Sequence, residues 1–269
     1  MTQGTTEAKV TGKPRLWERV FSAGTECPGC TIPMTQRLLC EIIDELGIEN
    51  NTIQVGGIGC TSGGANAAVN VDGVQAAHGR SVNVASAIKR LSPKGTIVYT
   101  IQGDGDCMAI GAEGLIQAAS YGEKITIVMV NNANFGRTGG QMGLTSLVGQ
   151  VTTTTPMGKN PSEFGYPIHA AEMVASFKGV TYSARGAVDS PANYLKTKKY
   201  LKAAFAKQIE GRGLSFVEIL SACPANWHLS PVQALKWLRE NMLPEFPLGE
   251  FKNVDSPDQS TKEEHSEKK

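Results

Sequence analysis

The chain has 269 residues, of which 41% are hydrophobic and 30 are glycine, and its formal net charge is +1. This length can bury one large core, and the composition is typical of an α/β protein with many turns. The near-zero net charge gives no reason to expect a nucleic-acid partner, and no apolar run approaches the roughly 18 residues that a membrane-spanning helix needs.

The two ends of the chain differ from its middle. Residues 1–16 are expected to form an N-terminal extension that lacks the apolar core of a signal peptide, so we expect a cytoplasmic protein with no membrane partner. The main domain is predicted to span residues 17–251. Residues 252–269 are rich in Lys, Glu, Ser and Asp, and we expect a polar tail that is disordered or wraps a partner.

Cys27 and Cys30 form a Cys-x-x-Cys pair, a spacing that is typical of metal ligands. A predicted helix follows the pair, beginning near Pro33 and ending at Gly47, with apolar residues at helical spacing. In a cytoplasmic chain, cysteines are more readily explained as metal ligands or core residues than as disulfides. Cys40 in this helix and Cys107 further along are predicted to be core residues.

Two further cysteines follow predicted strands. Cys60 lies where a strand runs into a glycine-rich loop, and Cys223 follows the apolar strand 216–220. Loops at one edge of a sheet can bring these two thiols to Cys27 and Cys30, and four thiolates are the number that an iron-sulfur cluster takes. A zinc site, a thioredoxin-like redox pair at Cys27 and Cys30, and simple burial of the other two remain alternatives.

The middle of the chain contains a predicted strand, turn, helix and strand. Residues 96–101 and 125–130 are β-branched and apolar runs, and residues 108–121 carry helix formers that end at Gly122. In such a unit the strands are parallel and the crossover is right-handed, so both strand ends open on the same edge of the sheet. We therefore expect Asp104 and Asn132, which follow the two strands, to be neighbours.

The residues after these strands suit a magnesium diphosphate site. Mg²⁺ takes six oxygens, and a carboxylate from Asp104, the amide oxygen of Asn132 and a backbone carbonyl, for which Asn134 is the candidate, would join two diphosphate oxygens and a water. Gly103 and Gly105 allow the backbone to approach the phosphates, and the following helix presents its N–H groups to the anion. The alternative is a tight turn without a ligand.

Polar residues in two other loops are candidates for the same site. His78 and Arg80 supply a donor and a guanidinium that suit a diphosphate or a carboxylate, although a lone histidine more often has a structural role. Thr138 and Gly139 are predicted to close around the diphosphate, with the hydroxyl as donor. Arg137 is a candidate for binding a substrate carboxylate, with a solvated surface charge as the alternative.

Taken in order, these motifs resemble the β subunit of 2-oxoacid:ferredoxin oxidoreductases. The motifs are the Cys-x-x-Cys pair, Ala-His-Gly-Arg at 77–80, Gly-Asp-Gly-Asp at 103–106, residues 131–141, the threonine run 152–155 and Cys223. The resemblance covers roughly residues 20 to 230. It implies an α/β, thiamine diphosphate-binding fold with a six-stranded, mainly parallel sheet and helices on both faces.

The resemblance also implies the cofactors and the residues that hold them. Thiamine diphosphate would be contacted by Gly103, Asp104, Gly105, Asp106, His78, Arg80, Asn132, Thr138 and Gly139. Mg²⁺ would be held by Asp104, Asn132 and the backbone of Asn134, and a [4Fe-4S] cluster by Cys27, Cys30, Cys60 and Cys223. His78 and Arg137 are the candidate catalytic residues.

The implied reaction is the coenzyme A-dependent oxidative decarboxylation of a 2-oxoacid, with electrons passing through the cluster to ferredoxin, or the reverse carboxylation. Pyruvate, 2-oxoglutarate, branched-chain 2-oxoacids and aryl glyoxylates all remain open as substrates. The reason is that Arg137 and residues 61–66 depart from the pattern of the family.

One expected part of a thiamine enzyme is not recognisable in the sequence. The glutamate that activates the aminopyrimidine comes from a pyrimidine domain, so the resemblance implies a partner α subunit, with γ and ferredoxin-like δ subunits as further partners. We predict that the chain alone is inactive. A non-redox thiamine lyase or synthase subunit, and a metal-stapled assembly subunit with a vestigial cofactor site, are the alternative functions.

Overall fold

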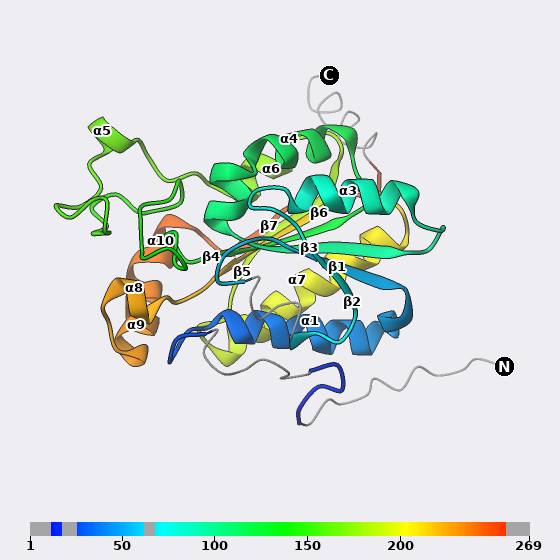
Figure 1. The fold of residues 1–269 in the computed structure, drawn as a ribbon, viewed down its shortest axis with the longest axis horizontal. Helices are drawn as coiled ribbons and strands as arrows, with labels where there is room; N and C mark the ends of the chain where they lie inside the picture. The colour runs from blue at the N-terminus through cyan, green and yellow to red at the C-terminus, as the bar shows by residue number, and fades with distance from the viewer. Residues whose placement is uncertain (1–11, 18–25, 62–67, 257–269) are drawn as a thin grey trace, which may run out of the picture.

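A seven-stranded sheet in the order β2-β1-β3-β4-β6-β5-β7 forms the centre of the computed structural model, which describes residues 12–17, 26–61 and 68–256 (Figure 1). All neighbouring strands are parallel except β5 and β7. The strands are β1 Thr52–Gly56, β2 Asp72–Gln75, β3 Ile97–Gly103, β4 Thr126–Asn131, β5 Val180–Ala187, β6 Leu214–Leu220 and β7 Gly249–Asn253.

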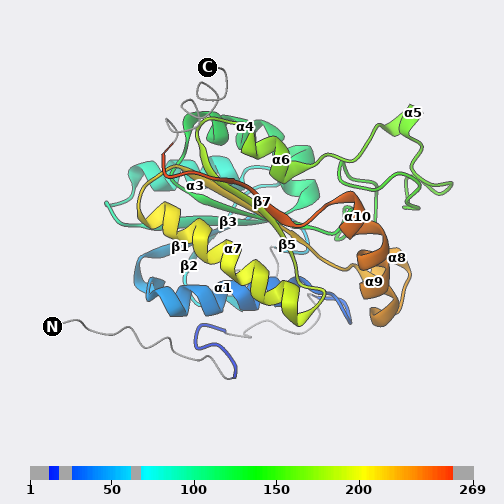
Figure 2. The ribbon, with the colours of Figure 1, turned by 180° about the vertical axis from the view of Figure 1, so that it is seen from behind.

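Helices cover both faces of this sheet (Figures 1 and 2). On one face lie α1 Ile32–Leu46 and α7 Pro191–Ile209, and on the other lie α3 Ser81–Leu91, α4 Ala112–Tyr121 and α6 Ala170–Ala175. The short elements α8 Pro224–Trp227, α9 Pro231–Trp237, η3 Leu238–Met242 and α10 Leu243–Glu245 pack together after β6. This is the predicted arrangement of a mainly parallel sheet with helices on both faces. In the described part of the chain, no helix is long and apolar enough to cross a membrane.

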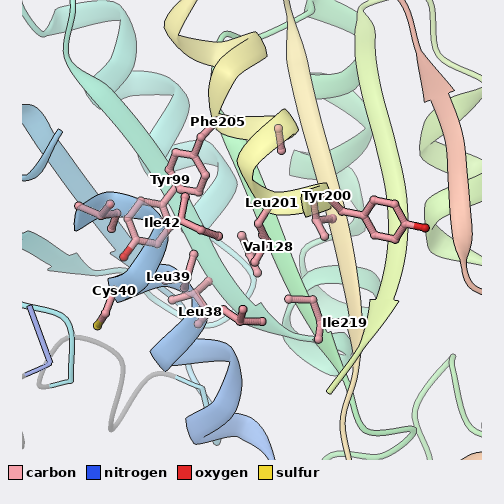
Figure 3. Close-up of a cluster of buried hydrophobic side chains, with 14 of the residues drawn as sticks. Leu38, Leu39, Cys40, Ile42, Tyr99, Val128, Tyr200, Leu201, Phe205 and Ile219 are labelled. Atoms are coloured by element: carbon pink, nitrogen blue, oxygen red, sulfur yellow. The ribbon is translucent and has the colours of Figure 1, made fainter. Parts of the chain in front are cut away.

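The core on the α1 and α7 side follows from the apolar spacing of those helices. Leu38, Leu39 and Ile42 of α1 are fully buried, and they lie beside Leu201 and Phe205 of α7 against the sheet (Figure 3). Burial of a side chain of this size contributes about 1.5–3 kcal/mol each. Cys40 belongs to this cluster and Cys107 to the cluster on the opposite face, as predicted for core cysteines.

The predicted helix ends are confirmed at two glycines. Gly47 ends α1 and Gly122 ends α4, and both adopt the left-handed conformation that glycine tolerates best. The crossover between β3 and β4 begins earlier than predicted, because the π-helix η2 Gly105–Ile110 precedes α4. The backbone therefore turns into a helix directly after Asp104, at the edge of the sheet where β3 and β4 end.

The number of strands and the two ends of the domain differ from expectation. The sheet has seven strands instead of six, because β7 adds an antiparallel edge strand to β5. Its sequence carries no long apolar run, since an edge strand is buried on fewer sides. The strand includes Lys252 and Asn253, so the ordered domain extends into the expected tail, and residues 257–269 lie outside the described residues. At the other end, Leu16 of the expected N-terminal extension is buried in the core.

Candidate functional site

The parallel pairing of β3 and β4 brings the two halves of the predicted metal site together. The register pairs Gly103 with Val130, so Asp104 and Asn132 both follow strand ends at one edge of the sheet. Gly105 is required there, because a Cβ atom at this position would lie 2.4 Å from the Phe135 ring. The neighbourhood predicted from the βαβ pattern is confirmed.

Three oxygen atoms face one another at this edge. The side-chain oxygen of Asn132 lies 2.8 Å from the backbone oxygen of Asn134 and 3.2 Å from Asp104 Oδ1. Turning the Asn132 amide over lets its nitrogen donate to both oxygens, and a cation bound by the amide oxygen is the other way to satisfy these groups. Adjacent ligands of Mg²⁺ in an octahedron are about 2.9 Å apart, given Mg–O distances of about 2.1 Å. The two separations are thus compatible with neighbouring ligands of one Mg²⁺ ion.

Hydrogen bonds hold a strained residue in this loop. Ala133, between the two asparagines, is fully buried and has φ of 55°, a left-handed conformation that costs a non-glycine residue about 1–3 kcal/mol. Its N–H donates to Asn131 Oδ1 at 2.9 Å, and its carbonyl accepts from Ser146 Oγ at 2.6 Å and Gln150 Nε2 at 2.9 Å. The loop is therefore held from both sides.

Asp104 is almost fully buried, and burial raises the pKa of its carboxyl to about 7. The Thr145 hydroxyl donates to Asp104 Oδ2, and this bond opposes the rise in pKa. Thr145 carried no motif signal in the sequence, since it lies 41 residues from Asp104. Near neutral pH a metal ion can therefore displace the proton of this carboxyl group.

A pocket of about 90 Å³ opens beside these oxygens. Most of the residues predicted for the cofactor line it, namely His78, Gly103, Asp104, Gly105, Asp106, Asn132, Asn134, Arg137 and Thr138. Phe135 and Ile58, which sequence reasoning missed, line it as well. Thr138 Oγ1 donates to Gln141 Oε1 at 2.6 Å within the exposed turn.

His78 is oriented by Asp106. The carboxylate oxygen Oδ1 of Asp106 accepts from His78 Nδ1 and from the Gly79 N–H at 2.7 Å, while Oδ2 accepts from Gln102 Nε2 at 2.9 Å. The oxygens of Asp106 are thus occupied by protein donors, although the residue was predicted to contact the cofactor. Because Nδ1 of His78 is the donor to this carboxylate, Nε2 is left for the pocket.

Two predicted cofactor residues lie outside the pocket lining. Arg80 precedes α3, and its Nη1 donates to Glu113 Oε2 of α4 at 3.2 Å on the exposed surface. Gly139 lies in the exposed turn with φ of 115° and does not line the pocket either. The motif predicted correctly that His78 lines the pocket. It did not predict the direction of the Arg80 side chain, which depends on where α3 begins.

All four predicted cysteines line a second, larger pocket of about 490 Å³: Cys27, Cys30, Cys60 and Cys223. Cys27 and Cys30 come from the loop before α1, Cys60 from the loop after β1, and Cys223 from the residue before α8. In the described residues, no three Cys, His, Asp or Glu side chains converge on a single metal ion. The thiols therefore surround a space instead of meeting at one point.

Burial favours the neutral form of these thiols. It raises the pKa of Cys30 to about 12 and that of Cys60 to about 11, and it also raises the pKa of Cys223. Charge repulsion among the thiolates adds to the rise for Cys30 and Cys60. These cysteines therefore ionise to thiolates only when a positively charged group compensates their charge.

The two pockets share a wall. Ile32, Cys60, Asn132, Gly136 and Arg137 line both. Gly136 permits this close approach, because a Cβ atom there would lie 3.0 Å from Cys60 Sγ. Arg137 is close enough to Cys60 for its positive charge to oppose the rise in the pKa of that thiol.

Comparison with known proteins agrees with this geometry. Residues 57–219 match the family "Thiamine pyrophosphate enzyme, C-terminal TPP binding domain". The ketoisovalerate oxidoreductase subunit VorA of Methanothermobacter marburgensis is 38% identical over 256 residues, which are 92% of this chain and 53% of VorA. This chain thus spans about half the length of that relative.

Two further relatives extend the comparison. The 2-oxoglutarate synthase subunit KorB of the same organism is 31% identical over 226 residues, covering 81% of this chain and 73% of KorB. The fold matches a solved 2-oxoglutarate:ferredoxin oxidoreductase from Magnetococcus marinus with a TM-score of 0.74 and 23% identity, covering 96% of this chain and 91% of that one. The chain therefore belongs to the 2-oxoacid:ferredoxin oxidoreductase family, among the subunits that carry a thiamine pyrophosphate-binding domain.

Proposed function

We propose that this chain is the β subunit of a 2-oxoacid:ferredoxin oxidoreductase, which decarboxylates a 2-oxoacid, transfers the acyl group to coenzyme A and passes electrons through a [4Fe-4S] cluster to ferredoxin, or runs this reaction in reverse. The observation that carries the proposal is that the pocket beside Asp104 and Asn132 shares a wall with the pocket lined by the four cysteines, here called the four-thiol pocket. A non-redox thiamine lyase has no use for four thiols next to its cofactor.

The oxygens of Asp104, Asn132 and Asn134 support a magnesium ion that holds the diphosphate of thiamine diphosphate. When bound, this cofactor supplies the carbanion that cleaves the bond between the keto and carboxyl carbons of a 2-oxoacid. The N–H groups at the start of η2 favour the diphosphate charge. His78 presents Nε2 to the pocket, where it can hold or accept a proton.

The four thiols support a [4Fe-4S] cluster more than a zinc ion. A four-cysteine zinc site commonly uses two close Cys-x-x-Cys pairs, whereas Cys60 and Cys223 stand alone in the sequence. A cluster uses the same four thiolates spread around a larger body, and it accepts electrons one at a time. Cys60 lies in the wall shared with the cofactor pocket, so an electron would have a short path across it.

Arg137 is our candidate for substrate recognition. Its guanidinium lines both pockets and is exposed, so it can bind a carboxylate of the incoming 2-oxoacid in a bidentate manner. The matched relatives are named for ketoisovalerate and 2-oxoglutarate, and both are 2-oxoacids. We propose a 2-oxoacid as the substrate class, without a choice of side chain.

The site requires a second chain. Cofactor pockets commonly enclose about 300–1,000 Å³, whereas the pocket beside Asp104 measures about 90 Å³. Asp104 and Asp106 are the acidic residues in its lining, and no described glutamate lines it. We therefore propose an α subunit that closes over the cofactor and supplies the glutamate for the aminopyrimidine, with γ and ferredoxin-like δ subunits as further partners.

The assembled enzyme tests this proposal. The chain should be purified without oxygen, alone and with its coexpressed partner, and assayed with a panel of 2-oxoacids, coenzyme A and a viologen dye. We expect turnover by the complex and none by the single chain, because half of the cofactor site is missing from the latter. Turnover by the single chain would refute the need for an α subunit, and decarboxylation by the complex without dye reduction would favour a non-redox lyase.

A projecting segment, residues 142–168, offers a surface for this partner. It contains α5 Pro161–Phe164 and extends away from the sheet (Figures 1 and 2). The hydrogen bond from Thr145 to Asp104 connects it to the site. Met157 is 95% exposed and Tyr166 is 75% exposed on it. Apolar side chains gathered on a projecting loop favour contact with another protein.

The substitution Met157→Asp should therefore weaken association with the coexpressed α subunit by about 10-fold or more, since a charge would be buried in an apolar contact. Leu91→Asp is the matched control, because Leu91 is 87% exposed but lies at the end of α3. Size-exclusion chromatography with a subunit titration measures the effect. Equal association of both variants would exclude this segment as the docking surface.

A further inference from the structure

A glutamate in the middle of β6 is the unexpected feature of the sheet. Every residue of β6 Leu214–Leu220 is buried, and Glu218 is fully inaccessible to solvent. An apolar residue would suit this position better, because a buried ion pair contributes little net stability compared with well-packed apolar side chains. Stability of the fold therefore does not explain why a glutamate occupies this position.

The partners of Glu218 connect it to the sheet on one side. Arg185 of β5 is also fully buried, and its Nε donates to Glu218 Oε2 at 2.8 Å. The guanidinium is held in turn by Glu172, by the Pro247 carbonyl at 3.0 Å, and by the rings of Phe246 and Phe251. Glu218 is thus anchored in one orientation.

On its other side Glu218 contacts the loop of residues 131–134, here called the magnesium loop. Its Oε1 accepts from Asn131 Nδ2 at 2.7 Å, and Asn131 Oδ1 accepts from the Ala133 N–H at 2.9 Å. This second bond holds Ala133 in its left-handed conformation, with φ of 55°. Ala133 separates Asn132 and Asn134, whose oxygens face Asp104. A buried chain of hydrogen bonds thus runs from Arg185 through Glu218 and Asn131 to the backbone of Ala133.

We propose that Glu218 is a positioning residue for the magnesium loop, acting through Asn131 on the backbone of Ala133. It fixes which way the Asn131 amide points, so that the oxygen faces Ala133 and the nitrogen faces Glu218. The left-handed turn then aims Asn132 and Asn134 at the position of the cation. This inference rests on the proposed thiamine diphosphate and Mg²⁺ site and adds to it a residue that contacts neither group.

The test measures metal binding apart from turnover. The full chain with its coexpressed partner is loaded with thiamine diphosphate, and Mn²⁺ in place of Mg²⁺ is titrated by electron paramagnetic resonance. Glu218→Gln should weaken Mn²⁺ binding by about 10- to 100-fold, as is typical when an outer partner of a metal ligand is lost. Glu41→Gln is the matched control: it makes the same chemical change at a buried, ion-paired glutamate of α1, outside this network, and should leave Mn²⁺ binding unchanged.

A second substitution separates positioning from general loss of structure. Glycine adopts positive φ without the cost that alanine bears, so Ala133→Gly should restore most of the Mn²⁺ affinity in the Glu218→Gln background and change little by itself. If Glu218→Gln does not fold, Asn131→Ala serves instead, because it removes the side-chain acceptor of the Ala133 N–H through which Glu218 is proposed to act.

The outcomes are distinct. Wild-type affinity in both Glu218→Gln and Asn131→Ala, or a loss in Glu218→Gln that Ala133→Gly does not recover, would overturn the positioning role. Absence of Mn²⁺ and thiamine diphosphate binding in the wild-type complex would instead refute the proposed function on which the role rests.

Discussion

Replacement of Asp104 by asparagine should abolish Mg²⁺-dependent binding of thiamine diphosphate without weakening the metal-free fold. The carboxylate is the one charged ligand among the three oxygens, so its loss should exceed the roughly 10- to 100-fold effect of outer partners on metal affinity. Isothermal titration of the complex with thiamine diphosphate, at fixed Mg²⁺, measures this. Retained binding would contradict the magnesium assignment.

The stability of the metal-free protein supplies the second half of this prediction. Burial raises the pKa of Asp104 to about 7, above its value in the unfolded chain, so this group stabilises the fold at low pH and the contribution is lost as pH rises through 7. An asparagine side chain cannot ionise; the unfolding free energy of Asp104→Asn should therefore rise relative to that of wild type between about pH 4 and about pH 7. Metal affinity of the wild type should fall below pH 7, because protons compete with Mg²⁺.

A matched control is available for the charge change itself. Asp72→Asn removes an exposed carboxylate from the first residue of β2, whereas the site lies beyond the last residues of the strands, and it should leave thiamine diphosphate binding unchanged. If both aspartate variants lost binding equally, the effect would come from the net charge of the protein and not from a metal ligand.

Loss of any one of the four pocket cysteines should remove the iron-sulfur cluster. Cys223→Ser, in anaerobically purified protein, should lower iron and acid-labile sulfide far below the four atoms of each that one [4Fe-4S] cluster carries. The physical reason is that the remaining thiols stay neutral through burial unless a complete cluster compensates their charge. Metal analysis and the visible absorption spectrum measure the result.

Cys107 provides the control for this prediction. It is as buried as any thiol in the described part of the chain but lies in the core cluster beneath α4, away from the four-thiol pocket. Cys107→Ala should keep its full content of iron and sulfide. A wild-type protein with stoichiometric zinc or without iron would refute the cluster, and full iron in Cys223→Ser would remove that residue from the ligand set.

Much of the candidate site could be predicted because it depends on rules that apply to every βαβ unit. Parallel strands joined by a right-handed crossover end at one edge of a sheet, so Asp104 and Asn132 had to meet once β3 and β4 were recognised. The thiols of Cys60 and Cys223 follow strands in the same sheet, and their loops open on the same pocket as the Cys-x-x-Cys pair. The meeting of Asp104 and Asn132 follows from chain topology, whereas the choice of these four cysteines as a set came from the family resemblance.

Other parts of the site depend on contacts that leave no local pattern. Thr145 reaches Asp104 across 41 residues, and Glu218 reaches Asn131 across 87. Arg80 was expected at the cofactor because it belongs to the same motif as His78, yet α3 begins at the next residue and directs its side chain to Glu113. Two residues of one motif can thus have quite different contacts.

The sequence alone determined the fold class, the edge of the sheet that carries the site and the residue types available for metal binding, because these follow from hydrophobic periodicity, turn residues and the handedness of crossovers. Only the tertiary structure decided how the donors are aimed. The left-handed Ala133, the raised pKa of Asp104 and the wall shared by the two pockets all arise from burial and from hydrogen bonds between distant segments. Such effects depend on the packed environment, which no short stretch of sequence specifies.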